Sequence, residues 1–368
     1  MDEHPQSAAM HRALSRRLAT QRLTSAPLAA AADVVRLLGC VQAQERASAF
    51  YSLGLRTRTA TVESVQAELD AGAIIRTHIL RPTWHFVAPE DLRWMLALTS
   101  PKVEQGMGAR HRQLELTPRT IDRGLDDLTE LLCGRTFRTR RQLGPPMERR
   151  GIAVGAQLGH LLLLAELRGL ICSGPTVGGQ HSYALIDEWV ATAAALEPDA
   201  AASRLVKRFF AGHGPASLPD LTRWCTLTQA DARAALAILG DELEKIEVNG
   251  TALWFDPSLP ARTTRKRRAL LLPVFDEATL SYPQLRFPRI DGHPHSALKA
   301  VSDLFSGSII VDRLNVGTYT RTVTAKAVTV RLRFASSATV DQQRQGRQSA
   351  DAIGDFHSLP VQPTSRVG

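Results

Sequence analysis

Residues 64–89 read "SVQAELDAGAIIRTHILRPTWHFVAP", and this stretch decides the expected fold. Its first part has the helical spacing of apolar residues and carries the pair Glu68-Leu69. Gly72 follows, where a glycine can adopt the left-handed conformation that ends a helix. Two short apolar or β-branched runs come next, divided by the turn residues Arg81 and Pro82. We therefore predict a helix that leads directly into a β-hairpin.

The same order recurs twice further along the chain. Residues 161–186 ("LLLLAELRGLICSGPTVGGQHSYALI") and 235–256 ("ALAILGDELEKIEVNGTALWFD") each carry a helical segment with a Glu-Leu pair, followed by two short runs. Turn residues divide the runs in both, and in the third stretch they are Asn249 and Gly250. Asn-Gly is the strongest short hairpin signal.

Two further helical patterns precede each of the three stretches. They lie at residues 10–20 and 26–39, 120–134 and 138–151, and 201–214 and 217–228. A helix followed by a hairpin is common, but agreement of order and content in three copies indicates a repeat. We predict three tandem winged-helix motifs in an arc, at residues 1–115, 116–195 and 196–262.

The sequence pattern changes from mainly helical to mainly strand-like after residue 262. Segments such as "GSIIVDRL" and "VTAKAVTVRLRF" alternate as strands do, so we expect a small β-barrel-like C-terminal unit at residues 263–340. Residues 341–368 read as a polar, weakly patterned tail, with room for a short helix and otherwise expected to be mobile. The expected fold class is therefore α+β.

Composition and charge limit the partners. The 368 residues are 44% hydrophobic and 22% charged, with a net charge of +9, which favours nucleic acid or an anionic membrane as a partner. No apolar run approaches the roughly 18 residues of a membrane span, and the N-terminus lacks a secretory signal. We expect a cytoplasmic, monomeric protein that binds double-stranded DNA and no membrane.

Several kinds of catalytic site are excluded by missing motifs. The zinc-deaminase pattern, the P-loop, G-x-G-x-x-G and G-x-S-x-G are all absent. The four cysteines are scattered without a C-x-x-C pair, so we interpret them as core residues and expect no metal and no cofactor. His293 and His295, in "DGHPHSA", are either exposed turn residues or part of a hairpin that probes DNA.

Clusters of basic residues are candidates for phosphate contacts. Any one cluster is usually a solvated face, but together, in a positively charged chain, they favour DNA binding. The candidates are Arg135, Arg138, Arg140, Arg141, Arg149 and Arg150 in the second motif, and Arg262, Arg265, Lys266, Arg267 and Arg268 after the third.

Two neutral amides stand out in "GCVQAQERA", residues 39–47. Gln42 and Gln44 directly follow an apolar helical stretch. In the first expected hairpin, alternation along a strand puts Thr83 and His85 on one face and Trp84 on the other. A structural role is the usual one for such residues, but the hairpin belongs to the same small domain as the glutamines.

These stretches resemble a known family. Residues 37–58 ("LLGCVQAQERASAFYSLGLRTR") and 74–96 ("IIRTHILRPTWHFVAPEDLRWML") are similar to the winged-helix DNA glycosylases of the AlkZ type, and the resemblance extends through "LLPVFDEATLSY". It implies excision of alkylated purines and unhooking of interstrand crosslinks, including azinomycin-type lesions in self-resistance. The family's Gln-aliphatic-Gln signature corresponds here to Gln42-Ala43-Gln44.

The reaction implied by the resemblance, hydrolysis of the bond between an alkylated purine and its sugar, explains why two amides suffice for catalysis. N7-alkylation makes the purine a cationic leaving group, so no general acid is needed. By resemblance, Gln42 and Gln44 hold the attacking water through their carbonyl oxygens, although an amide cannot act as a strong base. Thr83 and His85 are further candidates for the same site. No lysine adjoins the pair, so we expect a monofunctional enzyme without a Schiff-base step.

Two other classes remain open from the residues. Winged helices mostly bind DNA without chemistry, so a transcriptional regulator is one alternative and an architectural protein another. The glutamine pair separates the classes, because a regulator does not need paired amides outside its recognition helix.

Overall fold

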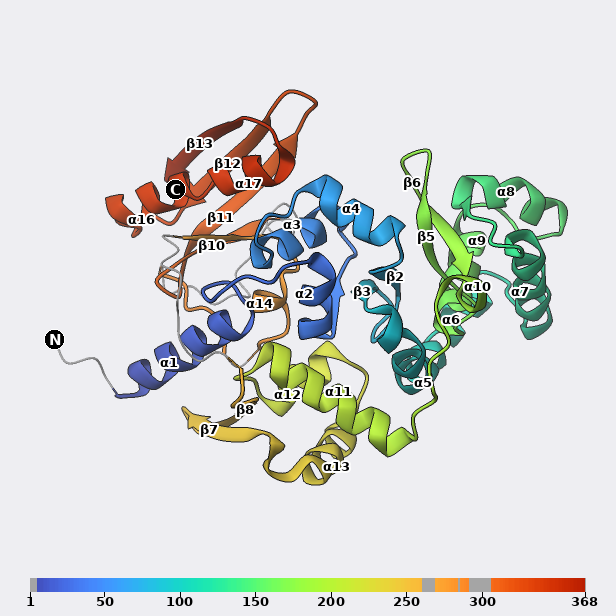
Figure 1. Cartoon of the computed structure of the whole chain (residues 1–368), viewed down its shortest axis with the longest axis horizontal. Helices are drawn as coiled ribbons and strands as arrows, with labels where there is room; N and C mark the ends of the chain where they lie inside the picture. Colours follow the sequence, from blue (N-terminus) through green and yellow to red (C-terminus); the bar gives the residue numbers. More distant parts are fainter. Residues whose placement is uncertain (1–4, 260–268, 284, 291–305, 368) are drawn as a thin grey trace.

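The computed structural model describes residues 5–259, 269–283, 285–290 and 306–367. These residues form helices mixed with small, mainly antiparallel sheets (Figure 1). The arginines and lysine at residues 262–268 and the two histidines at 293 and 295 lie outside the described residues.

The first module contains the predicted helices and hairpin, with two elements inserted between them. Its elements are α1 (Pro5–Thr20), α2 (Ala31–Leu38), β1 (Cys40–Gln42), α3 (Arg46–Arg56), α4 (Val62–Asp70), β2 (Ile75–His78) and β3 (Trp84–Val87). Thr61 caps the start of α4, and Gly72, with φ of 73°, follows its end as predicted. β1 adds to the hairpin, so that the sheet order is β1-β3-β2.

The second module has the predicted order of three helices and a hairpin. It consists of α7 (Pro118–Leu132), β4 (Arg138–Thr139), α8 (Arg140–Arg149), α9 (Ala156–Leu167), β5 (Ile171–Val177), β6 (Gln180–Leu185) and α10 (Ile186–Trp189). Helices α5 (Pro89–Gln105) and α6 (Gly108–Gln113) connect it to the first module.

The third module repeats that order. It consists of α11 (Pro198–His213), α12 (Leu218–Trp224), α13 (Gln229–Leu239), the short 3-10 helix η1 (Gly240–Glu242), β7 (Glu244–Val248) and β8 (Thr251–Phe255). Asn249 and Gly250 join the two strands with φ of 51° and 73°, the left-handed pair that a tight hairpin requires. The hairpin predicted at this dipeptide is confirmed.

The C-terminal unit differs from the expectation in two ways. It consists of β9 (Leu270–Leu272), α14 (Glu277–Leu280), β10 (Gly307–Val311), β11 (Leu314–Val323), β12 (Val328–Phe334), α16 (Val340–Gln348), α17 (Asp351–His357) and β13 (Val361–Val367). The sheet order β13-β12-β11-β10-β9 leaves β13 and β9 as edges, so the described strands do not close the expected barrel. The expected polar tail also contains more structure than the short helix that its sequence allowed: residues 340–367 form two helices and a strand, and β13 pairs in parallel with β12.

A shared core joins the first module to the C-terminal unit. Leu14, Val35 and Phe50 belong to the same buried cluster as Leu271 and Phe334. At α3, Arg56 makes a fully buried ion pair with Asp276 at 2.8 Å. The glutamine-bearing segment between α2 and α3 is therefore held against residues from the far end of the chain.

Three of the four cysteines fit the prediction of core residues. Cys40, Cys172 and Cys225 are buried, whereas Cys133 is exposed after the end of α7, which corrects the expectation for that residue. Among the described residues, no set of three or more His, Cys, Asp or Glu side chains is grouped for metal binding. None of the described helices combines the length and apolar character needed to cross a bilayer.

Candidate active site around Gln42 and Gln44

The glutamine pair lies where β1 ends beside β3. Gln42 is the last residue of β1 and is paired with His85, and the residue is only 8% exposed. Gln44 lies two residues further on and is exposed. The predicted candidates Gln42, Gln44, Thr83 and His85 are thus brought together, with one carboxamide buried and the other facing solvent.

Donor-only partners fix the orientation of both carboxamides. The Arg81 guanidinium donates from Nη2 to Gln42 Oε1 at 2.8 Å, and the Trp84 backbone N–H donates to Gln44 Oε1 at 3.3 Å. A guanidinium or a backbone N–H cannot accept, so the oxygen of each amide must face it. Among the described residues neither Nε2 group donates to the protein. Each side chain therefore retains two N–H donors and one oxygen lone pair for a ligand.

The backbone of the motif is held from both sides. Ala43 N donates to the Trp84 carbonyl at 2.7 Å. The Ala43 carbonyl accepts from Nε and Nη2 of Arg76 at 3.2 and 3.0 Å, while the Arg76 guanidinium lies 3.9 Å above the Trp84 ring. The two glutamines consequently project from a main chain whose position is fixed.

His85 is neutral and has a defined tautomer. Its Nε2 lies 3.3 Å from Arg81 Nη2 and must accept, so Nδ1 carries the proton and donates to the Thr83 carbonyl at 2.8 Å. Burial, followed by the Arg81 charge, holds the pKa of His85 well below its ordinary value. His85 therefore supports Arg81 and is not a proton donor at neutral pH. The Thr83 hydroxyl is buried and has no hydrogen-bond partner among the described residues.

Glu277 lies directly behind the strand. Its Oε1 accepts from the Gln42 backbone N–H at 2.7 Å, and the side chain is fully buried. Burial raises the pKa of Glu277 to about 7, against the opposing effects of the Gln42 hydrogen bond and the Arg81 charge. The Glu277 side chain anchors the main chain of Gln42, and its charge acts on Arg81.

The sequence interpretation did not identify Arg81 or Glu277 as site residues. In the sequence Arg81 reads only as a turn residue before β3, and Glu277 lies in the stretch "LLPVFDEATLSY", which indicates the family and no site residue. The signal for Glu277 was a pair of adjacent carboxylates after an apolar strand, which is unusual in a core. No local signal connects Arg81 to a glutamine 39 residues away.

The predicted basic residues lie in a different module. Arg135, Arg140, Arg141 and Arg149 are exposed, and α8 lies at the end of the molecule away from β3, beyond the β5–β6 hairpin (Figure 1). Arg138 donates from Nε to the Leu131 carbonyl at 2.8 Å. Arg150 is paired with Asp127 at 2.6 Å and Glu130 at 2.7 Å, so its charge is already balanced.

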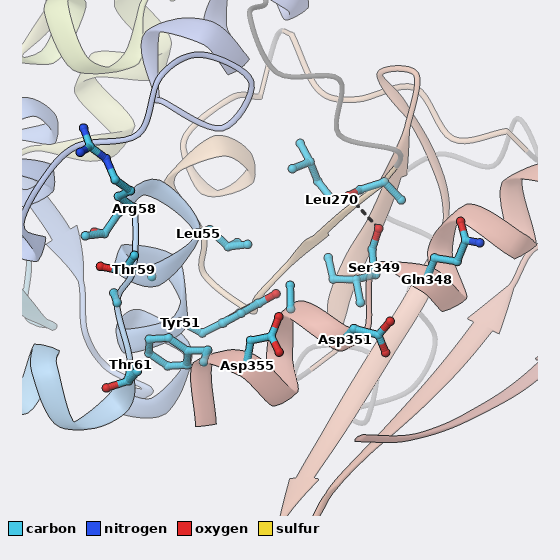
Figure 2. Close-up of a pocket in the computed structure, with 17 residues that line it drawn as sticks. Tyr51, Leu55, Arg58, Thr59, Thr61, Leu270, Gln348, Ser349, Asp351 and Asp355 are labelled. Atoms are coloured by element: carbon cyan, nitrogen blue, oxygen red, sulfur yellow. Dashed lines mark hydrogen bonds between the residues drawn. The ribbon is translucent and has the colours of Figure 1, made fainter. Parts of the chain in front are cut away.

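A separate cavity of about 780 Å³ lies between α3 and the two C-terminal helices. Figure 2 shows Tyr51 and Thr61 on one side and Asp351 and Asp355 on the other. Neither glutamine lines it. The glutamine pair therefore belongs to a different part of the molecular surface.

The chain belongs to a known class of protein. Residues 35–349 match the family described as DNA glycosylase AlkZ-like, and the chain belongs to this family, as its resemblance indicated. An interstrand DNA cross-link repair glycosylase from Streptomyces sahachiroi is 28% identical over 231 residues. That alignment covers 60% of this chain and 62% of the relative, which is less than two thirds of its length. The solved structure of Streptomyces sahachiroi DNA glycosylase AlkZ has a similar fold, with a TM-score of 0.75, 21% identity, and coverage of 96% of this chain and 99% of that chain.

Proposed function

We propose that the protein is a monofunctional DNA glycosylase that hydrolyses the N-glycosidic bond of N7-alkylated purines in duplex DNA, including purines in interstrand crosslinks. The observation that carries the proposal is the pair of carboxamides anchored through their oxygens by Arg81 and the Trp84 N–H. Family membership favours this function over a DNA-binding regulator.

The remaining donors and lone pairs of the glutamines suit a water molecule. Such a water accepts from an Nε2–H group of Gln42 or Gln44 and donates to a free oxygen lone pair. Holding it against C1′ supplies the proximity that the reaction needs, because the cationic purine leaves without protonation. The neutral state of His85 fits a mechanism without a general acid. An amide has no useful pKa for proton abstraction, so the proton of the water passes to solvent as the bond breaks.

The substrate requires an accessible site. A base tied to the opposite strand cannot be flipped alone into a closed pocket, as other glycosylases require. The exposure of Gln44 supports an open site. We further propose that the three helix–hairpin modules are winged helices arranged in an arc around the duplex, and that the protein acts as a monomer. Exposed arginines such as Arg140 and Arg141 would then contact phosphates.

Alanine substitutions of the glutamines test the proposal. We expect Gln42→Ala and Gln44→Ala each to lower the single-turnover release of N7-methylguanine from a defined duplex by about 10- to 100-fold, the effect of removing a positioned polar group. DNA affinity and the melting temperature should stay near wild type. Gln44→Asp should retain more activity than Gln44→Ala, because a carboxylate can accept a proton and stabilise the cationic sugar.

Gln362→Ala is the matched control, since Gln362 is exposed on β13. It should excise at the wild-type rate. Wild-type excision by both Gln42→Ala and Gln44→Ala would refute the assigned role, and absence of any base release by the wild-type protein would refute the glycosylase assignment itself.

A further inference from the structure

Arg81 is placed by an unusual backbone conformation. Leu80 is fully buried, and its φ of 64° lies in the left-handed region. A leucine backbone is strained in that conformation. Arg81 N donates to the Ile79 carbonyl at 2.7 Å, and Thr83 N donates to the Arg81 carbonyl at 2.7 Å, so two three-residue turns follow one another. Strain of this kind persists only where the surroundings over-determine it, and it concentrates at functional sites.

The turns direct the guanidinium at three acceptors. Nη2 meets Gln42 Oε1 at 2.8 Å and His85 Nε2 at 3.3 Å, and Nη1 donates to the Arg223 carbonyl at 3.0 Å. His85 and the Arg223 carbonyl are themselves fixed by the fold. Gln42 is the contact that belongs to the proposed glutamine pair, and its carboxamide rotates freely unless something holds it.

We propose that Arg81 is a positioning residue for base excision, which holds Gln42 Oε1 inward and thereby presents Nε2 to the reacting water. This inference rests on the proposed function. A guanidinium can only donate, so it excludes the flipped amide in which Nε2 would face inward. The charged donor also polarises the amide and strengthens its N–H groups as donors.

The positive charge of Arg81 would oppose a cationic transition state if nothing offset it. Burial lowers the pKa of Arg81, and the charge of Glu277 is the first effect that raises it again. Glu277 lies behind Gln42, where it accepts from the backbone N–H. When ionised, Glu277 offsets the charge of the guanidinium on the buried side and leaves the hydrogen bond from Arg81 to the amide in place.

The test uses Arg81→Ala, which removes all three donations and leaves space for a small cation. At saturating enzyme, we expect its single-turnover release of N7-methylguanine to fall by about 10- to 100-fold, while the Kd for the same duplex stays within about threefold of wild type. Added methylguanidinium should restore part of the rate, and sodium chloride at equal ionic strength should not. In Arg81→Ala/Gln42→Ala, methylguanidinium should restore nothing. Arg366→Ala is the matched control, because Arg366 is exposed on β13, and it should excise at the wild-type rate.

Other outcomes would overturn the inference. A wild-type rate for Arg81→Ala would do so, as would a weaker Kd with an unchanged saturated rate, which would make Arg81 a phosphate contact. If Arg81→Ala does not fold, Arg81→Met, which keeps the length of the side chain, decides by the same two measurements, and a wild-type rate again refutes the inference. Loss of excision in Gln42→Ala together with wild-type excision in Arg81→Ala would reject this inference and leave the proposed function intact.

Discussion

Asp276 and Glu277 are neighbours and both are buried, yet their pKa values shift in opposite directions. Burial alone would raise the pKa of Asp276, but Arg56 bonds both of its oxygens at 2.8 Å and holds that pKa below its ordinary value. Glu277 accepts one backbone N–H, and its Oε2 has no partner among the described residues. Because burial acts on both carboxylates, the difference between their pKa shifts comes from the number and charge of their partners.

Glu277 makes stability depend on pH in a predictable direction. Its pKa of about 7 exceeds the ordinary 4.5, so the stability it contributes is fully present below pH 4.5 and is lost as pH rises to 7. Glu277→Gln keeps an oxygen for the Gln42 N–H and has no charge to bury. We expect it to be more stable than wild type at pH 8, by roughly 2–3 kcal/mol, and equal to it near pH 4. Urea unfolding at both pH values measures this, and an equal loss of stability at both would contradict it.

At the scale of elements, hairpins were predictable and long-range pairings were not. Gly72 and the Asn249-Gly250 turn act through their own backbone angles, so the signals are local. β1 has three residues and becomes a strand only because β3 pairs with it. β13 is exposed along most of its length and pairs in parallel with β12, so its sequence lacks the alternation of a half-buried strand.

The residues of the candidate site also fall into a group that the sequence predicts and a group that it does not. The motif Gln42-Ala43-Gln44 was visible as a local pattern, and its proximity to His85 followed from both belonging to one small module. Arg81 and Glu277 reach the motif only through tertiary contacts, across separations of 39 and 235 residues. Such contacts leave no periodic trace in a single sequence.

The C-terminal helices are structural parts of the fold. A substitution in α17 can test this role. Phe356 is 3% exposed and packs edge-on against Tyr51 of α3, with ring centroids 5.6 Å apart. We expect Phe356→Ala to lower the free energy of unfolding by about 3–4 kcal/mol, the usual cost of truncating a buried phenylalanine. Chemical denaturation measures it. A loss below about 1 kcal/mol would mean that α17 contributes little to the core.

At the scale of the whole molecule, the proposed DNA affinity comes from arginines with no carboxylate partner. Arg141 is exposed on α8 and has no ion-pair partner among the described residues, whereas Arg150 is held by two carboxylates. A paired arginine displaces fewer counterions from DNA than an unpaired one.

Salt dependence distinguishes the two arginines. The logarithm of the affinity for undamaged duplex should fall linearly with the logarithm of salt concentration, by about 0.9 per phosphate neutralised. We expect Arg141→Ala to reduce that slope by about 0.9 and Arg150→Ala to leave it unchanged. Fluorescence anisotropy over a salt series provides the measurement, and a salt-independent affinity of the wild-type protein would argue against DNA as the partner.

The contact between Glu277 and the Gln42 backbone also sets when the protein can begin to work. During translation Gln42 leaves the ribosome before the carboxylate behind it, which follows 235 residues later. A nascent chain that ends after β8 therefore carries the glutamines with neither the Glu277 anchor nor the Arg56–Asp276 pair. The proposed glycosylase is therefore completed only after Glu277 has been synthesised, so a product interrupted before that residue would bind DNA without a finished catalytic site.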